Sequence, residues 1–155
     1  MRIREGDPLE IYTSADGEVI FKKYSAINEM ASSASQVAEV MTRLANCPTV
    51  VFDRDHVVAV AGVQKKEFSE RRVSRALEEY LESRKNYIRS SSAEAKVFPV
   101  EGVDQAALAC SPILASGDVT GAVAFLAPND SAVANEVQQN LIQAAAQFLG
   151  KQIED

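Results

Sequence analysis

Cysteine and histidine are scarce in this sequence of 155 residues, which contains two cysteines and one histidine. Cys47 and Cys110 lie far apart, in no CxxC or Cys/His spacing, so the sequence predicts neither a disulfide framework nor a zinc site. One histidine, His56, cannot supply a histidine-based metal site either. We therefore expect two buried structural thiols and no metal.

Long apolar runs are also missing. The longest run spans only a handful of positions, whereas a membrane-spanning helix needs about 18 apolar residues. The sequence also lacks the charged segment followed by an apolar stretch that is typical of a secretory signal. We expect a cytoplasmic protein without a membrane partner. Because 46% of the residues are hydrophobic, the chain can bury the core of one domain, with or without a small appendage.

The common catalytic motifs GxxxxGK(S/T), HExxH, GxSxG and GxGxxG are absent from the sequence. His56 stands beside Asp55 at the start of a predicted strand, which favours a local hydrogen bond over the role of a general base. Cys110 lies in an apolar run, where burial would leave its thiol unreactive. We predict no enzyme, no catalytic residue and no cofactor. A small redox enzyme remains an alternative, and it would require Cys47 and Cys110 to meet.

Basic residues are outnumbered by acidic residues, 16 to 22, giving a formal net charge of −6. This balance argues against nucleic-acid binding through the overall field of the chain. A local cluster formed by Arg71, Arg72 and Arg75 could receive an anionic ligand. Its alternation with glutamates instead favours a solvated helix face.

Two alanine-rich segments show the spacing of amphipathic helices. The first runs from Ser25, a plausible N-cap, to Asn46, and the second starts after Asp130 or Ser131 and includes Val133 in its apolar stripe. Small alanine side chains let helices approach closely, so we expect these helices to pack together. The residues predicted to form a dimer interface are Met30, Ala34, Val37, Met41, Leu141, Ala145 and Phe148.

Alternating and β-branched runs predict two hairpins between these helices. The first joins 49–53 to 56–61, and the second joins 108–115 to 119–126 through the turn at 116–118. A charged helix is predicted at about 69–83, and a short strand at 96–100. This order predicts an α+β domain with an antiparallel sheet and its first and last helices on one face.

The chain starts with another predicted hairpin, which joins 9–13 to 19–21 through Ser14-Ala15-Asp16-Gly17. A two-stranded hairpin is marginal in water by itself. Its apolar residues must therefore be covered by the rest of the chain, by a second copy, or by a segment that precedes it.

Together, these features resemble two known families. The order of elements and the hairpin Gly117-Asp-Val-Thr-Gly121-Ala-Val-Ala-Phe-Leu126 resemble the GAF domain, a sensory fold. Residues 2–11 and 18–24 resemble the second half of the AbrB-type swapped-hairpin DNA-binding domain. The resemblance implies a sporulation transcription regulator, with an incomplete DNA-binding domain at 1–24 and a GAF-like sensory and dimerisation domain at 25–155.

In the AbrB-type family, the hairpin interleaves with that of a second chain, and arginines in the first half of the domain grip DNA. That half is absent from this sequence, so the resemblance implies DNA as a partner only of the complete protein. Arg2 and Arg4 are DNA-proximal candidates, with solvated charges at a strand end as the alternative.

The resemblance to GAF domains implies a ligand pocket on the sheet, opposite the long helices. Its candidate lining residues are Phe52, Val60, Phe68, Phe98 and Cys110, each of which also fits an ordinary core. The leading hypothesis is a module that senses an unknown small-molecule effector and self-associates as a dimer or tetramer. The alternative is a purely structural dimerisation domain without a ligand.

Overall fold

The computed structural model describes residues 9–13, 19–23, 31–129 and 131–154. Strand β1 (Leu9–Thr13) pairs with β2 (Val19–Lys23) in an antiparallel two-stranded sheet, with Ile11 opposite Phe21. The hairpin predicted at the start of the chain is therefore formed. Its turn and the predicted start of the first long helix lie outside the described residues.

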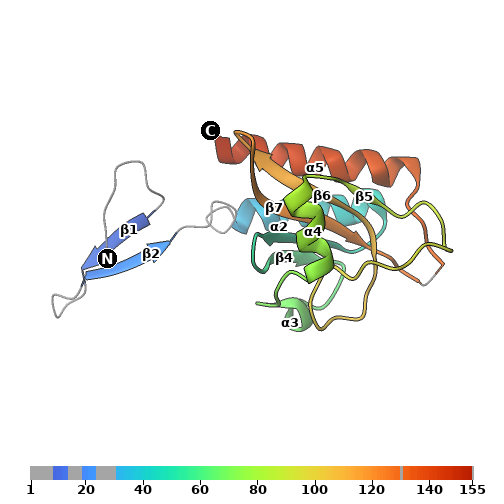
Figure 1. The fold of residues 1–155 in the computed structure, drawn as a ribbon, viewed down its shortest axis with the longest axis horizontal. Helices are drawn as coiled ribbons and strands as arrows, with labels where there is room; N and C mark the ends of the chain where they lie inside the picture. Colours follow the sequence, from blue (N-terminus) through green and yellow to red (C-terminus); the bar gives the residue numbers. More distant parts are fainter. Residues whose placement is uncertain (1–8, 14–18, 24–30, 130, 155) are drawn as a thin grey trace.

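A second antiparallel sheet forms the body of the described chain (Figure 1). Its strands lie in the order β4-β3-β7-β6-β5, so the hairpins β3-β4 and β6-β7 are joined where β3 pairs with β7, and β5 pairs with β6 at the edge. The bounds of these strands are β3 Thr49–Asp53, β4 Val57–Ala61, β5 Tyr87–Ile88, β6 Ala107–Ala115 and β7 Asp118–Leu126.

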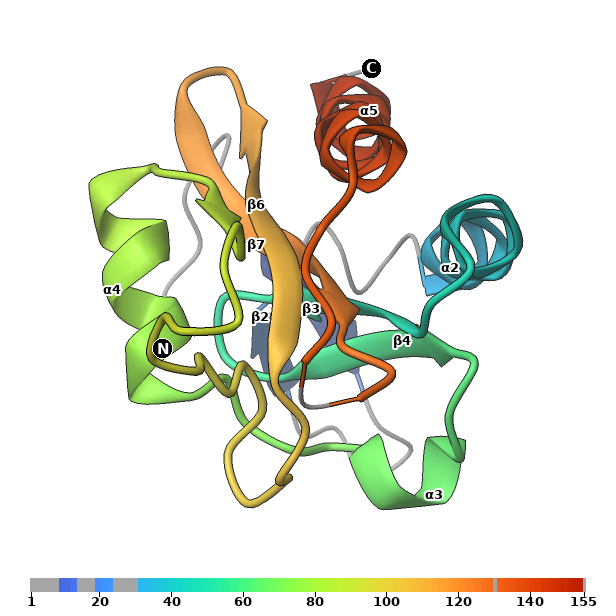
Figure 2. The same ribbon diagram turned by 90° about the vertical axis from the view of Figure 1, so that its right-hand side faces the viewer.

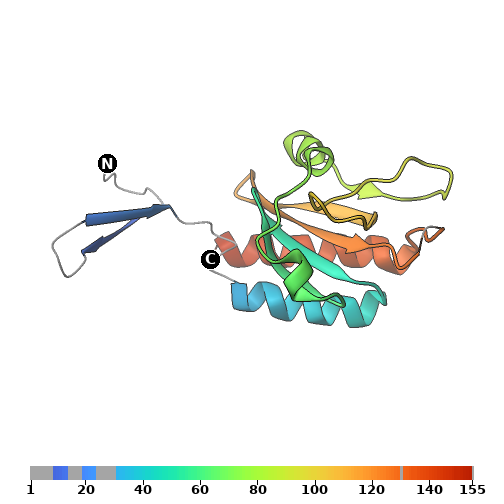
Figure 3. The same ribbon diagram turned by 90° about the horizontal axis from the view of Figure 1, so that it is seen from below.

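The two long helices, α2 (Ala31–Ala45) and α5 (Glu136–Glu154), lie side by side on one face of this sheet (Figures 2 and 3). Helix α4 (Arg75–Ser83) covers the opposite face, and the short helix α3 (Lys65–Phe68) precedes it. This arrangement confirms the predicted α+β class and the packing of the first and last helices on one face.

Both faces of the sheet are buried, which explains why its strands are almost continuously hydrophobic. Side chains alternate between the faces with a period of two. Val51 packs in the core under α2 and α5, which we call the helix-side core. Its neighbours Val50 and Phe52 pack in the core under α4, which we call the α4-side core.

The predicted turn of the second hairpin is confirmed. Ser116 and Gly117 both have positive φ angles, 52° and 85°, and Ala115 pairs with Asp118 across the turn. Two central residues with positive φ define the tight turn whose twist matches that of paired strands.

The helix predicted at 69–83 begins only at Arg75. The hydroxyl of Ser74 accepts a hydrogen bond from the backbone N–H of Leu77 at 3.1 Å and caps the helix. The preceding residues are extended instead, since Arg72 bridges to His56 and Val73 bridges to Val100. These non-local pairings override the helical spacing of the local sequence.

The last helix also begins later than predicted, at Glu136 rather than after residue 130 or 131. Asn135 and Gln138 form a reciprocal cap. The Asn135 side chain accepts from the Gln138 N–H at 2.7 Å, and the Gln138 side chain accepts from the Asn135 N–H at 3.0 Å. Val133 therefore precedes the helix and does not belong to its apolar stripe.

The strand predicted at 96–100 is wrong, because only Val100 takes part in a bridge. The strand that pairs with β6 is β5, where Tyr87 lies opposite Cys110. This two-residue strand is too short to show alternation in the sequence, so the spacing argument missed it.

Candidate functional site

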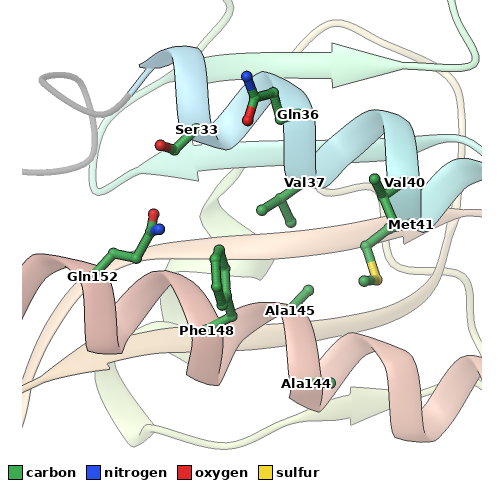
Figure 4. Close-up of a pocket in the computed structure, with 9 residues that line it drawn as sticks. All are labelled: Ser33, Gln36, Val37, Val40, Met41, Ala144, Ala145, Phe148 and Gln152. Carbon is green, nitrogen blue, oxygen red and sulfur yellow. The ribbon is translucent and has the colours of Figure 1, made fainter.

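Helices α2 and α5 leave a groove between them at the surface, with a volume of about 400 Å³ (Figure 4). Among the described residues that line it, none carries a charge. We call it the α2–α5 groove, and its lining residues are Ser33, Gln36, Val37, Val40, Met41, Ala144, Ala145, Phe148 and Gln152.

Small side chains set the depth of this groove. Ala34 and Ala38 of α2 and Ala145 and Ala146 of α5 are buried in the helix-side core, so both helices lie close to the sheet. Larger apolar side chains then point between the helices. Figure 4 shows Val37 of α2 and Phe148 of α5 pointing toward each other across the groove.

The helices around the groove expose large apolar side chains. The exposed fractions are 41% for Val40, 58% for Leu44, 56% for Val137 and 50% for Phe148. Single exposed hydrophobic residues are ordinary, but a cluster of them around an uncharged groove is typical of an interaction surface. The structure therefore supplies α2 and α5 with an apolar face that no other described residue covers.

The residues predicted for a dimer interface divide into two groups. Ala34 and Ala145 are buried in the core of the chain itself, whereas Val37, Met41 and Leu141 are half-buried and Phe148 is half-exposed. Met30 lies outside the described residues. The helical period explains why some of these residues are buried and others are not. In α5, the residues that face the sheet include Ile142, Ala146 and Leu149, and the predicted interface residues lie next to them around the helix.

The residues predicted to line a ligand pocket lie mostly in the α4-side core. Phe52, Phe68 and Cys110 are buried there, whereas Val60 is half-buried and Phe98 is exposed. A cavity beside Val60 holds only about 30 Å³. Because ligand pockets measure roughly 300 Å³ or more, the described side chains on this face form a filled core.

The two thiols are buried, as predicted, on opposite faces of the sheet. Cys47 lies in the helix-side core and Cys110 in the α4-side core. Burial raises the pKa of each thiol to about 12. A thiol with so high a pKa is almost entirely protonated at neutral pH, which makes it a poor nucleophile.

The imidazole of His56 takes the local role expected for it. Its Nδ1 atom lies 3.1 Å from Oδ1 of Asp53, and the same oxygen accepts the backbone N–H groups of Asp55 and His56 at 2.6 and 2.8 Å. Asp53 thus closes the β3-β4 turn. Arg71, Arg72 and Arg75 are exposed, in agreement with a solvated surface.

Within the described ranges, no group of three histidine, cysteine, aspartate or glutamate side chains could hold a metal ion. The same residues include no helix that is long and apolar enough to cross a membrane.

Arg89 is a notable residue that the sequence argument did not single out. It directly follows β5 and is only 1% exposed. Its Nη1 atom donates to the carbonyl oxygens of Glu94 and Ala95 at 3.2 and 3.5 Å, and its Nη2 atom donates to that of Ser92 at 3.1 Å. A signal for it exists in the sequence. If residues 87–89 are extended, the side chains of Tyr87 and Arg89 lie on the same face of the strand.

The antiparallel sheet, with paired terminal helices on one face and α4 on the other, defines a GAF-like domain. A GAF domain/HD domain protein from Geobacter sulfurreducens matches 86% of this chain and 99% of its own, with a TM-score of 0.59 and 13% identity. A type II free methionine-R-sulfoxide reductase from Thermoplasma acidophilum matches 82% of this chain and 94% of its own, with a TM-score of 0.60 and 9% identity. At such low identities the likeness shows the fold alone.

The family is shown by sequence. Residues 29–154 match the family described as stage V sporulation protein T C-terminal, transcription factor. Stage V sporulation protein T of Bacillus subtilis (strain 168) is 35% identical over 156 residues, which cover 99% of this chain and 85% of that protein. The chain therefore belongs to the stage V sporulation protein T family, and it is a sporulation transcription regulator whose described domain has a GAF-like fold.

Proposed function

We propose that the GAF module of this regulator joins two chains through their α2–α5 grooves. The observation that supports this proposal is the uncharged groove of about 400 Å³ flanked by exposed apolar side chains of both helices. Two such helix pairs would meet as a four-helix bundle. A tetramer would require a further contact outside this groove.

A second copy of the chain is the occupant that the groove suits best. In a dimer with two-fold symmetry, the same surface meets itself, so the surface must carry both projections and a hollow. Val40 and Phe148 are 41% and 50% exposed, and the small residues Ala144 and Ala145 line the same groove. The absence of charge among the described lining residues also removes the like-charge repulsion that opposes a symmetric contact.

We further propose that the β1-β2 hairpin is part of a DNA-binding domain, with DNA as its partner. The hairpin would pair with its counterpart in a second chain, with Arg2 and Arg4 as DNA-proximal residues. Seven residues, 24–30, separate β2 from the described start of α2 and span at most about 25 Å. This short connection would make the spacing of two hairpins depend on how two α2 helices pack.

The sensory part of the proposal is a small-molecule effector that binds on the α4 face and biases the packing of α2 and α5. A purely structural dimerisation domain is the second candidate. It is favoured by the filled α4-side core, in which Phe52 and Phe68 are fully buried.

The self-association proposal is tested by placing a charge in the groove. Val40→Glu introduces a residue that favours the helix more than valine does, and it brings two carboxylates together at a symmetric contact. Leu114→Glu is a matched control, since Leu114 is also 41% exposed but lies outside the groove. Sedimentation equilibrium should show dimers or tetramers for wild type and Leu114→Glu. For Val40→Glu we expect the dissociation constant to increase at least about 100-fold.

Three results would contradict the proposal. The first is a wild-type protein that stays monomeric up to high micromolar concentration. The second is equal dissociation by both glutamate variants. The third is a wild-type assembly that Val40→Glu leaves intact, which would place the contact on another surface.

A further inference from the structure

The buried guanidinium group of Arg89 makes no direct ion pair in the described part of the chain, and the nearby carboxylate of Glu94 attracts it only through space. Its hydrogen bonds go to backbone carbonyl oxygens of Ser92, Glu94 and Ala95, and no carboxylate of the described residues forms an ion pair with it. Buried charged groups in proteins are usually paired with an opposite charge, because carbonyl dipoles compensate a full charge only in part.

Tyr87 supplies a second polar group on the same face of the chain. Its hydroxyl oxygen is buried and has no hydrogen-bond partner among the described residues. Burial raises the pKa of this hydroxyl, and the Arg89 guanidinium opposes that rise, since it lies close enough to the hydroxyl oxygen to act on it as a hydrogen-bond donor and as a positive charge. A buried hydroxyl whose proton has no acceptor is rare, so this hydroxyl beside a buried guanidinium group requires an explanation.

Residues 90–96 cover Arg89, and every one of them is exposed. The segment therefore contributes no buried side chain to either core. The carboxylate of Glu94 accepts the N–H groups of Ser90 and Ser91 at 2.8 and 2.9 Å, which folds the segment on itself. The hydrogen bonds from Ser90 and Ser91, together with the charge of Arg89, lower the pKa of Glu94. Lifting the segment from Arg89 requires breaking the hydrogen bonds that three of its carbonyl oxygens accept from the guanidinium group.

We propose that Tyr87 and Arg89 form a carboxylate-binding site covered by residues 90–96, and that a small organic carboxylate is the effector. The proposal rests on the sensory part of the proposed function. A carboxylate would replace the neutral carbonyl oxygens on the guanidinium group with paired, charge-assisted hydrogen bonds. It would also accept the hydrogen bond that the Tyr87 hydroxyl lacks.

The backbone of Arg89 joins this site to the groove. Its N–H donates to the carbonyl oxygen of Leu108 in β6 at 2.8 Å, and its carbonyl oxygen accepts the N–H of Ala134 at 2.9 Å. Ala134 directly precedes Asn135, the cap of α5. A ligand that shifts Arg89 therefore acts on the segment that positions α5, and α5 forms one wall of the α2–α5 groove. This contact is the route by which binding would alter self-association.

The test measures thermal stability and calorimetric binding of the full chain with three sodium salts, acetate, isovalerate and succinate. The corresponding neutral amides and inorganic phosphate serve as comparison compounds at equal ionic strength. We expect at least one carboxylate to raise the melting temperature saturably, because a ligand that binds the folded state stabilises it. The neutral amides should have no effect.

Two variants assign the site. Tyr87→Phe should fold like wild type, since the hydroxyl has no partner among the described residues, and it should weaken carboxylate binding about 3- to 10-fold. Arg89→Lys keeps a cation but loses the paired geometry of the guanidinium group, and it should weaken binding at least about 10-fold. Lysine is chosen over a neutral residue because loss of the buried positive charge could prevent folding.

Different failures have different meanings. Equal binding of amides and acids, stabilisation by phosphate alone, or full affinity in Tyr87→Phe would overturn the carboxylate site. Stabilisation by a neutral compound alone would overturn it while leaving an effector in place. If no compound of either kind binds, the carboxylate site and the sensory proposal both fail, and self-association is still decided separately by Val40→Glu.

Discussion

Replacing Gly150 by alanine tests how closely α5 approaches the sheet. A Cβ atom at this position would overlap the carbonyl oxygen of Leu114 in β6 and lie 3.3 Å from its carbonyl carbon. Two opposing effects follow. Alanine favours a helix over glycine by about 1 kcal/mol, whereas forcing atoms into a packed core costs about 1–3 kcal/mol.

The steric effect should outweigh the helix propensity. The obstructing atoms belong to the backbone of a paired strand, so no side chain can rotate away, and the cost should lie at the upper end of its range. We therefore expect Gly150→Ala to lower the free energy of unfolding by about 2 kcal/mol, which corresponds to a melting temperature lower by about 4–8 °C.

Urea denaturation at one fixed protein concentration measures this change, since self-association makes apparent stability depend on concentration. Asn140, exposed on the same helix, provides the reference pair Asn140→Gly and Asn140→Ala. Alanine should be more stable than glycine there by about 1 kcal/mol. If Gly150→Ala were stabilised by a similar amount, the close approach of α5 to β6 would be refuted.

Two further predictions concern buried groups. Gln138→Leu removes the hydrogen bond from its side-chain amide to the carbonyl oxygen of Ala45, 2.9 Å away, and should lower the free energy of unfolding by about 1–3 kcal/mol, with Gln139→Leu as a milder control. Wild type should lose stability as the pH rises above 9, because the unfolded chain ionises its thiols there while folded Cys47 and Cys110 hold their protons up to about 12. The loss should be less steep in Cys110→Ala, and an equal slope in both proteins would contradict the burial of this thiol.

Strands were predictable where the local pattern was strong. Thr49–Asp53 has the predicted bounds, and the strands predicted at 108–115 and 119–126 each extend one residue further toward the N-terminus. The first residues of the helices were not predictable, because Ser74 and Asn135 act as caps only when the chain before them takes an extended path. That path depends on pairings such as Val73 with Val100, which connect residues far apart in the sequence.

Candidate site residues were harder to predict. The apolar residues Phe52 and Phe68 fit a pocket or a core equally well, and only packing shows that they fill the α4-side core. Arg89 looks like an ordinary surface arginine, because its burial depends on a covering loop that has no regular pattern.

By itself, the sequence determined the order of the two long helices and the hairpins between them, the antiparallel class of the sheet and the family, because hydrophobic periodicity, turn residues and family motifs are local properties of the chain. The tertiary structure decided which stripe of α5 faces the sheet, that Val40 and Phe148 remain exposed beside a groove, and that Arg89 is buried. These features depend on how distant segments share space, since a side chain's surroundings are set by neighbours that its own sequence does not include.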